Sequence, residues 1–583
     1  MMLSNPLKRF ALGLALGLVS ACAQPRPEAA PGATSTPEPT ATAAPTATPV
    51  FTPTPIAPPL RVADDLRASR LATPAPQRGA PCGVVDMLDF PVGPPDGDGF
   101  EARWVFGRFS SRYEGIHAGE DWGRTTGDSL GRPVHAIGHG MVTYAQPLGW
   151  GVDRGVVIVR HTFADGRTIL SFYGHLDPPS VVLRAGDCVA RGEQIGAIGK
   201  PRGRPHLHFE IRNHTPDDPG PGYWPADPRR AGWEPPSEYI WSYRIGTSPG
   251  VQWMRPFTAT VSTGAGLLSD GTLVASDDRR LIGIDPIDGS LRWSQPVSGT
   301  IHRVALDATG AAIYVSNPGN AVQAFDAQGQ PMWQVDFGQP ARPALMPLPG
   351  GGVVAHAQGQ LIGVSASGER LWQIDGVSPP FDWALDGERL LFTTDAEYPV
   401  VHSVDRSGDL RWLARAGGRL AVSGEQVFVY NAEGVFRLNP EKWKADLLLP
   451  LDPGAPGSSR IAATGDGGAI VSHVASAGRR LIGIDAGGAL RWDRSIADLD
   501  GRIARLLTSG DRVYAMLDDG DILAIDARDG EARRILDAGS GEQLGGEAWA
   551  FATEGGRLLL DFRGGMMVAV DPFEALGATG QVQ

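Results

Sequence analysis

Histidine and carboxylate residues recur between residues 117 and 208 of this 583-residue chain. His117 and Asp121 share one short motif, and His206 and His208 share another further along the chain. Two imidazoles and one carboxylate suit a catalytic zinc ion, because three protein ligands leave the fourth tetrahedral position open for a reactive water. These residue types therefore indicate metal-assisted hydrolysis with one Zn²⁺ per chain.

The second motif has the alternation of a β-strand. Polar and apolar residues alternate along Pro205–Ile211, and side chains two positions apart in a strand share a face. His206 and His208 are therefore expected to point the same way, while Leu207 and Phe209 point into a core.

The stretch from His117 to Arg212 resembles the LytM/lysostaphin-type peptidoglycan metallopeptidases. The supporting motifs stand in that family's order: Gly131–Ala136, Val156–His161, Ser171–Leu176, Leu183–Val189, Arg191–Gly196 and Pro205–Ile211. The resemblance implies that His117, Asp121 and His208 hold the zinc, whereas His175 and His206 lie beside it as catalytic residues. Some relatives have lost ligands and only activate other enzymes, but this chain keeps all five residues, which favours catalysis.

The reaction that the resemblance implies is hydrolysis of an amide bond. Zinc would polarise the scissile carbonyl and lower the pKa of a water molecule towards about 7. His175 and His206 would divide proton transfer and oxyanion stabilisation between them, and the sequence does not assign the two roles.

Glu210 is a competing base on the same strand face, which we interpret instead as an exposed carboxylate or a partner of a ligand. The remaining nearby histidines lack ligand spacing and are interpreted as structural or solvent-facing: His135, His139, His161 and His214.

The N-terminus has the features of a bacterial lipoprotein signal. Lys8 and Arg9 precede a short apolar run, and Val19-Ser-Ala-Cys22 matches a lipobox, in which the cysteine is acylated and becomes the new N-terminus. The apolar run is too short to span a bilayer as a helix. We therefore expect lipidation of Cys22 and an extracytoplasmic protein anchored to the cell membrane or outer membrane of a bacterium.

The other two of the chain's three cysteines are Cys82 and Cys188. Exported proteins meet oxidising conditions, so we expect a disulfide between them.

Between Gln24 and about Leu60 the chain is almost wholly Pro, Thr, Ala and Ser, a composition that forms an extended spacer rather than a core.

Beyond about Ser248 a turn motif with Asp or Asn, Gly and Trp recurs with a period of roughly 40 residues, as in propellers of four-stranded blades. Its copies span Leu281–Trp293, Val322–Trp333, Leu361–Trp372, Val401–Trp412, Val435–Trp443, Leu481–Trp492, Ile522–Gly530 and Met567–Asp571. Eight copies favour eight blades, with seven as the alternative. We interpret the tryptophans as packing between blades, and residues near Met254 to Val261 as the strand that completes the last blade.

This half resembles the PQQ-like repeat family. Relatives that oxidise alcohols with the quinone use an adjacent cysteine pair, and this half contains no cysteine. We therefore expect no quinone cofactor here, and interpret the propeller as a platform for a protein partner or a wall polymer.

The expected fold class is all-β: an antiparallel metallopeptidase sheet or sandwich followed by a propeller. The expected domains are the signal peptide (1–22), the linker and lead-in segment (23–79), the zinc peptidase (80–246) and the propeller (247–583). The net charge of −13 disfavours a nucleic-acid partner, because phosphate binding needs a concentrated basic face.

Three functions fit these features. The first is a membrane-anchored zinc endopeptidase that cuts peptide cross-links of peptidoglycan. The second is a catalytically silent regulator of another cell-wall hydrolase. The third is a propeller-based assembly or scaffold lipoprotein, which would leave the five site residues without a purpose.

Overall fold

The computed structural model describes residues 57–583 apart from several short segments. Those segments are 214–217, 257–265, 277–278, 320, 339–342, 395–399, 440–443, 455–457, 500, 510–511, 539–548, 553–555, 563–565 and 580–583. The expected signal peptide, Cys22 and most of the Pro/Thr-rich spacer therefore lie outside the described residues. Within those residues, no helix combines the length and the apolar character needed to cross a membrane.

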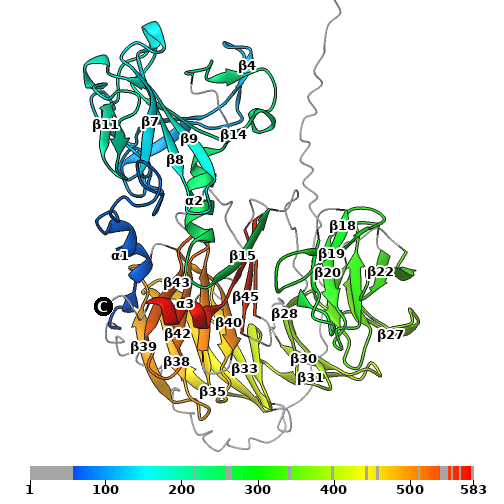
Figure 1. Cartoon of the computed structure of the whole chain (residues 1–583). Helices are drawn as coiled ribbons and strands as arrows, with labels where there is room; N and C mark the ends of the chain where they lie inside the picture. The colour runs from blue at the N-terminus through cyan, green and yellow to red at the C-terminus, as the bar shows by residue number, and fades with distance from the viewer. Residues whose placement is uncertain are drawn as a thin grey trace, which may run out of the picture. The chain divides into compact units, whose positions relative to one another are not determined.

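The first half of the described chain is built on one antiparallel sheet (Figure 1), with strand order β10-β7-β8-β9-β12-β5-β2 and β14 paired to β12. Its strands are β2 (Phe100–Trp104), β5 (Glu120–Arg124), β7 (Gly140–Gln146), β8 (Gly155–Thr162), β9 (Thr168–Leu176), β10 (Cys188–Val189), β12 (Leu207–Arg212) and β14 (Trp233–Glu234). Two smaller sheets join β6 (Pro133–His135) to β11 (Gln194–Ala197), and β3 (Phe109–Ser110) to β4 (Gly115–His117) and β13 (Tyr223–Trp224). Helix α2 (Pro236–Gly246) and the short 3-10 helices η1 (Gly151–Asp153), η2 (Pro178–Ser180) and η3 (Pro228–Ala231) complete this half.

Strand β12 lies in the middle of the sheet, between β9 and β5. Leu207 and Phe209 are fully buried in the core of this half, as the alternation predicts. The opposite face of β12 is buried as well, since His208 is 3% exposed and Glu210 is 0% exposed. A polar face can be buried only when its groups have hydrogen-bond partners, so this face must be organised by specific contacts.

The second half consists of repeated antiparallel sheets (Figure 1). Each of the first four sheets has four strands that follow one another along the chain. The first two sheets are β16 (Gly266–Leu267), β17 (Leu273–Ser276), β18 (Arg280–Ile284) and β19 (Leu291–Pro296), and then β20 (Arg303–Leu306), β21 (Ala312–Ser316), β22 (Ala321–Asp326) and β23 (Pro331–Asp336). The next two are β24 (Ala344–Pro347), β25 (Val353–Ala357), β26 (Gln360–Val364) and β27 (Arg370–Asp375), and then β28 (Pro380–Leu385), β29 (Leu390–Thr394), β30 (Val401–Val404) and β31 (Leu410–Ala414). They continue with β32 (Arg419–Ser423), β33 (Gln426–Asn431), β34 (Gly434–Asn439) and β35 (Lys444–Pro450); β36 (Arg460–Ala463), β37 (Ala469–Ala475), β38 (Gly478–Ile484) and β39 (Leu490–Ser495); and β40 (Ile503–Ser509), β41 (Arg512–Leu517), β42 (Ile522–Asp526) and β43 (Ala532–Leu536). The all-β fold class with a propeller is confirmed, and the number of blades stays a prediction.

The repeated tryptophans pack between neighbouring sheets, as predicted. Trp293 lies over Gly283 of the adjacent strand, where an added Cβ would be 2.2 Å from Trp293 Cε2. Its Nε1 donates a hydrogen bond of 3.1 Å to the carbonyl of Ala327 in the turn that follows the next sheet's third strand. The same contact to the next turn is made by Trp333, Trp372 and Trp492. Trp443 lies outside the described residues.

The strand that completes the last sheet is β15 (Val251–Pro256), which pairs antiparallel with β46 (Met566–Val570). The rest of this sheet is β44 (Trp549–Ala552) and β45 (Leu558–Phe562), and α3 (Pro572–Thr579) follows β46. The prediction placed this strand near 254–261, so its first residues were placed too late, and 257–261 lie outside the described residues. Trp253 supplies the missing tryptophan, because its Nε1 donates to the carbonyl of Pro286 in the first repeated turn.

The lead-in segment forms structure that the sequence analysis did not predict. Strand β1 (Val62–Ala63) pairs in parallel with β43 at the edge of its sheet. Helix α1 (Asp65–Leu71) follows, with Asp64 as its N-cap. Arg67 of α1 donates to Asp521 at 3.1 Å, and Arg534 donates to Asp64 at 3.0 Å. This short segment is therefore bound to the repeated half by backbone pairing and by ion pairs.

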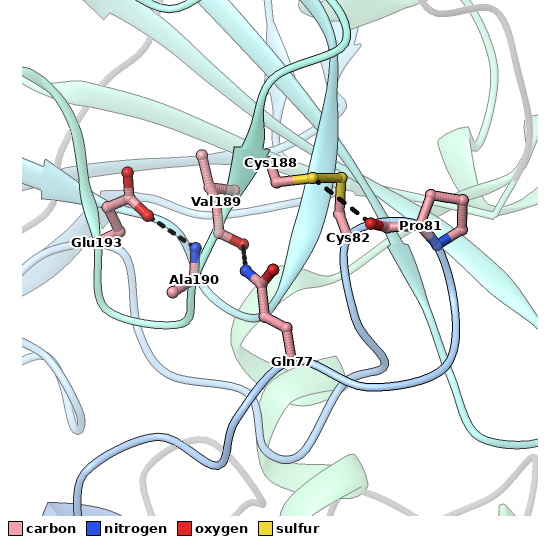
Figure 2. The surroundings of a disulfide bond; sticks show 7 residues. All are labelled: Gln77, Pro81, Cys82, Cys188, Val189, Ala190 and Glu193. Carbon is pink, nitrogen blue, oxygen red and sulfur yellow. Dashed lines mark hydrogen bonds between the residues drawn. A yellow bond between two sulfur atoms is a disulfide. The ribbon is translucent and has the colours of Figure 1, made fainter.

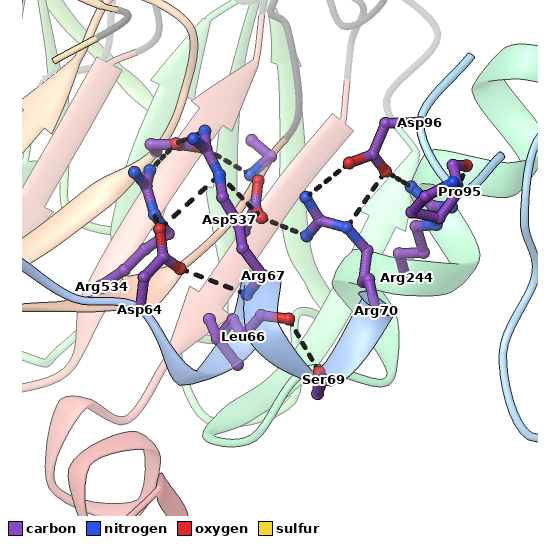
Figure 3. A network of polar contacts seen from close by, with 12 residues as sticks. Asp64, Leu66, Arg67, Ser69, Arg70, Pro95, Asp96, Arg244, Arg534 and Asp537 are labelled. Atoms are coloured by element: carbon purple, nitrogen blue, oxygen red, sulfur yellow. Dashed lines mark hydrogen bonds and ion pairs between the residues drawn. The ribbon is translucent and has the colours of Figure 1, made fainter. Parts of the chain in front are cut away.

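Arg70 of α1 bonds aspartates of both halves, Asp537 and Asp96 (Figure 3). One of its guanidinium nitrogens bonds Asp537, which follows β43. Its Nε donates to Asp96 at 3.1 Å, and Asp96 also accepts a bond of 2.7 Å from Arg244 of α2. Arg70 is 8% exposed, so these charges are paired in an environment where an unpaired charge would be costly.

A disulfide joins Cys82 to Cys188 of β10 (Figure 2), the pair that the cysteine count predicts. The two residues are 106 positions apart in the sequence. Gln77 adds a hydrogen bond to the carbonyl of Val189 beside it. The start of the peptidase half is thus tied covalently to its sheet.

We expect the double substitution Cys82→Ala and Cys188→Ala to lower the free energy of unfolding of this half by roughly 2–5 kcal/mol, because the cross-link restricts a long loop in the unfolded chain. Thermal unfolding with and without reductant measures the effect. Reductant should lower the melting temperature of the wild type to that of the variant and leave the variant unchanged. Alkylation of both thiols in native, unreduced protein would contradict the bond.

Candidate metal centre

Three predicted ligands converge in the structure. His117 comes from β4, Asp121 from β5 and His208 from β12, and one donor atom from each lies within 4.8 Å of the others. His208 Nδ1 is 2.9 Å from Asp121 Oδ1 and 3.0 Å from His117 Nε2, and His117 Nε2 is 3.2 Å from the same Asp121 oxygen. Ligands of a tetrahedral zinc ion with bonds of about 2.0–2.1 Å lie about 3.3 Å apart, so the donor set fits such an ion.

The three ligands can converge because the backbone at Gly119 lies very close to that of β12. A Cβ at this position would lie 2.4 Å from the carbonyl oxygen of Phe209 and 3.1 Å from His208 Nε2. The distance to the Phe209 carbonyl oxygen is too short for any side chain, so only glycine lets the His117–Asp121 segment pass this close to β12.

Hydrogen bonds fix which nitrogen of each ligand faces the centre. His117 Nδ1 donates to the carbonyl of Val105 at 3.2 Å, and His208 Nε2 donates to Glu210 Oε1 at 2.9 Å. When neutral, each ring therefore has its lone pair on the other nitrogen, and that nitrogen faces the donor cluster. Orientation of this kind is what metal-binding histidines need.

Without a metal ion, the two carboxylates beside His208 change the pKa values within the cluster. Burial lowers the pKa of His117 below its ordinary value. Burial alone would also lower that of His208, but its bonds to Asp121 and Glu210 outweigh this effect and raise its pKa to about 9. Burial alone would raise the pKa of Asp121, but hydrogen bonds with His117 and His208 hold it well below its ordinary value. The metal-free cluster therefore holds a proton on His208, where a cation is favoured.

Glu210 is neither exposed nor placed as a base. Its Oε1 accepts from His208, and its Oε2 accepts from Arg212 Nε and Trp233 Nε1, both at 2.7 Å. Burial alone would raise its pKa, but Arg212, His208 and Trp233 lower it to about 2. Glu210 lies on the far side of the His208 ring from the donor cluster, so the structure favours the interpretation as a partner of a ligand.

His175 and His206 lie beside the ligands. Their rings are 4.6 Å apart, and His206 Nε2 is 3.5 Å from Asp121 Oδ2. His175 Nδ1 donates to the carbonyl of Asp153 at 2.7 Å, and His206 Nδ1 donates to that of Arg204 at 2.8 Å. Each residue therefore has an Nε2 that can accept a proton. Burial, together with the nearby His206 and His208, lowers the pKa of His175 to about 3 and keeps it neutral.

The other histidines serve structure. His161 is fully buried and bonds the carbonyl of His139 and the hydroxyl of Ser171. His139 bonds the carbonyl of Ala75, and His135 bonds that of Gly192. None of these three belongs to the donor cluster, as predicted, and His214 lies outside the described residues.

Two of the ligands, Asp121 and His208, and both neighbouring histidines are reached from a cleft of 670 Å³. Asp121, His175, His206 and His208 line it, and aromatic residues form much of the remaining wall: Trp104, Phe109, Tyr113, Trp150 and Tyr223. An open cleft above a three-donor cluster leaves room for a water molecule and a substrate chain.

Two residues of the site escaped the sequence analysis. Trp150 lies 5.0 Å from His175 and 5.2 Å from His208 between ring centroids, and its Nε1 donates to the carbonyl of Gly220. Asp153 orients His175 through its backbone carbonyl. The Gly-Trp-Gly stretch around Trp150 is a weak sequence signal for a turn. The role of Asp153 could not be predicted, because any residue type supplies the backbone carbonyl that accepts the bond.

Comparison with known families matches both halves. Residues 115–219 match the family described as "Peptidase family M23", and residues 238–382 and 438–575 match the one described as "Outer membrane protein assembly factor BamB". The chain joins an M23 peptidase domain to a BamB-like propeller. The predicted LytM-type and PQQ-like resemblances are thereby confirmed.

No curated protein matches the chain in sequence. Solved structures similar to this chain include BamB from Moraxella catarrhalis, at 16% identity over 55% of this chain and 99% of that chain with a TM-score of 0.43. The computationally designed Ika8 protein has 17% identity over 54% and 98%, with a TM-score of 0.43. Saccharomyces cerevisiae Sqt1 has 10% identity over 56% and 99%, again with a TM-score of 0.43.

We expect Glu210→Gln to weaken zinc binding by the M23 domain by about 10- to 100-fold. Arg212 and Trp233 both donate to Oε2, so the amide oxygen should turn toward them and its NH₂ toward His208. His208 would then carry its proton on Nδ1, the atom needed for the metal. Competition with a chromophoric chelator measures the affinity. Glu120→Gln is the control, because Glu120 is buried but bonds Trp122 and Ser237. Equal losses in both variants would contradict this role.

The apparent zinc affinity should fall as the pH falls. The pKa of His208 is about 9 without metal, so binding below that pH must displace its proton. One displaced proton weakens the apparent affinity by about tenfold per pH unit. Chelator competition between pH 8 and pH 6 tests this slope, and a flat profile would contradict it.

Proposed function

We propose that this protein is a zinc metalloendopeptidase that hydrolyses peptide cross-links of peptidoglycan. The observation that carries the proposal is the convergence of His117, Asp121 and His208 beside a cleft that Asp121 and His208 line. The M23 family match supports a peptidase, and the ligand chemistry supports zinc.

When bound, zinc supplies Lewis-acid chemistry, which polarises the scissile carbonyl and acidifies a water molecule. The chain's own residues do the rest. His175 and His206 each hold Nδ1–H on a backbone carbonyl, so each can accept a proton at Nε2 and return it to the leaving amine. His117 and His208 direct their lone pairs to the metal ion, and the ring of Trp150 lies 5.2 Å from that of His208.

The anchor and the propeller complete the proposal. Cys22 carries the lipid, and the Pro/Thr-rich segment lets the extracytoplasmic enzyme reach away from the membrane of a bacterium. The BamB-like repeats support a second role for the propeller, which is to bind a protein partner or the wall polymer and to position the peptidase.

His208→Ala should abolish digestion of purified cell wall, because it removes one of three donors. Wild type and variant, both supplied with zinc, are incubated with purified peptidoglycan, and the products are separated and weighed by mass spectrometry. Wild type should convert cross-linked muropeptides into monomers and expose new amines. His135→Ala is the matched control, because His135 bonds Gly192 away from the donor cluster, and it should retain activity.

Digestion by His208→Ala at the wild-type rate would contradict the proposal. So would inactivity of the zinc-loaded wild type on every wall preparation. If cells carrying His208→Ala also behaved as wild type, the silent regulator would be the better function.

A further inference from the structure

The charged side chains that line the cleft fall into separate sets. Asp121 and the histidines belong to the donor cluster and its neighbours. Asp153 and Arg202 pair with each other, since Arg202 Nε is 3.0 Å from Asp153 Oδ1 and Nη2 is 2.5 Å from Oδ2. Within the described part of the chain, this leaves Arg112 as the charged lining residue without an opposite charge bound to it. The cleft therefore presents one uncompensated cation, although the whole chain has a net charge of −13.

Arg112 is held on an aromatic wall. Its guanidinium carbon lies 5.3 Å from the ring centroid of Tyr113, within the range of a cation–π contact. Tyr113 stacks on Tyr223 with ring centroids 4.5 Å apart and an interplanar angle of 25°. Tyr113 and Tyr223 come from segments far apart in the sequence, so the fold builds this wall.

The wall leads from the ligands to Arg112. The ring of Tyr223 lies 5.1 Å from that of His117. The path from His117 to Arg112 is no longer than roughly four residues of extended peptide, at about 3.3–3.6 Å per residue. A peptide with its scissile bond at the donor cluster can therefore place a side chain at Arg112.

We propose that Arg112 binds a carboxylate of the substrate peptide and makes the enzyme selective for cross-links that bear a free carboxylate near the scissile bond. This deepens the proposed function and rests on it. A guanidinium can bind a carboxylate through two parallel hydrogen bonds, and the aromatic face beneath it keeps it in place. An uncharged cross-link such as a glycine bridge offers Arg112 no partner. Arg112 is thus a specificity-determining residue at the cleft wall.

Two synthetic peptides test the proposal. They share one scissile amide and differ only in one side chain within about four residues of it, the reach to Arg112. This side chain ends in a carboxylate in the first peptide and in a carboxamide in the second. Full-length, zinc-loaded wild type should cleave the acid with a kcat/KM about tenfold higher than the amide. Arg112→Gln should lose this preference by slowing cleavage of the acid alone. Arg132→Gln, which changes an exposed arginine outside the cleft lining, should keep it.

The preference should shrink at high ionic strength, because Arg112 is exposed and salt screens exposed charges. Binding of both peptides is measured in parallel by tryptophan fluorescence, since Trp104 and Trp150 line the cleft. Equal handling of acid and amide by the wild type, or an equal loss on both peptides in Arg112→Gln, would overturn the proposal.

The binding measurement separates this proposal from the proposed hydrolysis. If neither peptide is cleaved but the wild type binds the acid more tightly and Arg112→Gln does not, the carboxylate site stands and the hydrolysis fails. Absence of both cleavage and binding preference would overturn both.

Discussion

The hydrogen bond between His208 and Glu210 determines what the cleft can bind. In the neutral ring of His208 it keeps the proton on Nε2, away from Asp121 and His117, so that Nδ1 can offer a lone pair to a metal ion. Glu210 can play this part because Arg212 and Trp233 hold its second oxygen. A buried carboxylate with full hydrogen bonding stays ionised and fixed in position.

The same network extends to the wall of the cleft. Arg212 also donates to the carbonyls of Asp218 and Pro219, and Trp150 donates to that of Gly220. The loop that these bonds hold leads into β13 and Tyr223, whose ring lies against His117. Ligand orientation and the shape of the substrate wall therefore depend on one connected set of bonds, and disturbing either affects the other.

The sequence predicted the parts of the fold that repeat or alternate. Strand alternation correctly placed Leu207 and Phe209 in the core, and the spacing of Asp, Gly and Trp correctly predicted packing between propeller sheets. The sequence did not predict contacts between residues that lie far apart in the chain. The burial of Glu210 depends on Trp233, the stacking of Tyr113 on Tyr223 joins residues more than one hundred positions apart, and His175 is oriented by a backbone carbonyl. Helix α1 is short and follows a Pro-rich stretch, so its pairing with Asp521 and Asp537 left no local pattern to find.

The attachment of the lead-in segment has a mechanical consequence. Backbone bonds link Leu60 and Pro58 to Ser495, β1 lies along β43, and Arg67 and Arg70 bind propeller aspartates before the chain reaches Cys82. Tension applied to the chain ahead of residue 57 would thus be borne first by the outer strands of the propeller. The peptidase cleft would be shielded from that load, and the spacing of His117, Asp121 and His208 would stay unchanged while the chain ahead of it is pulled.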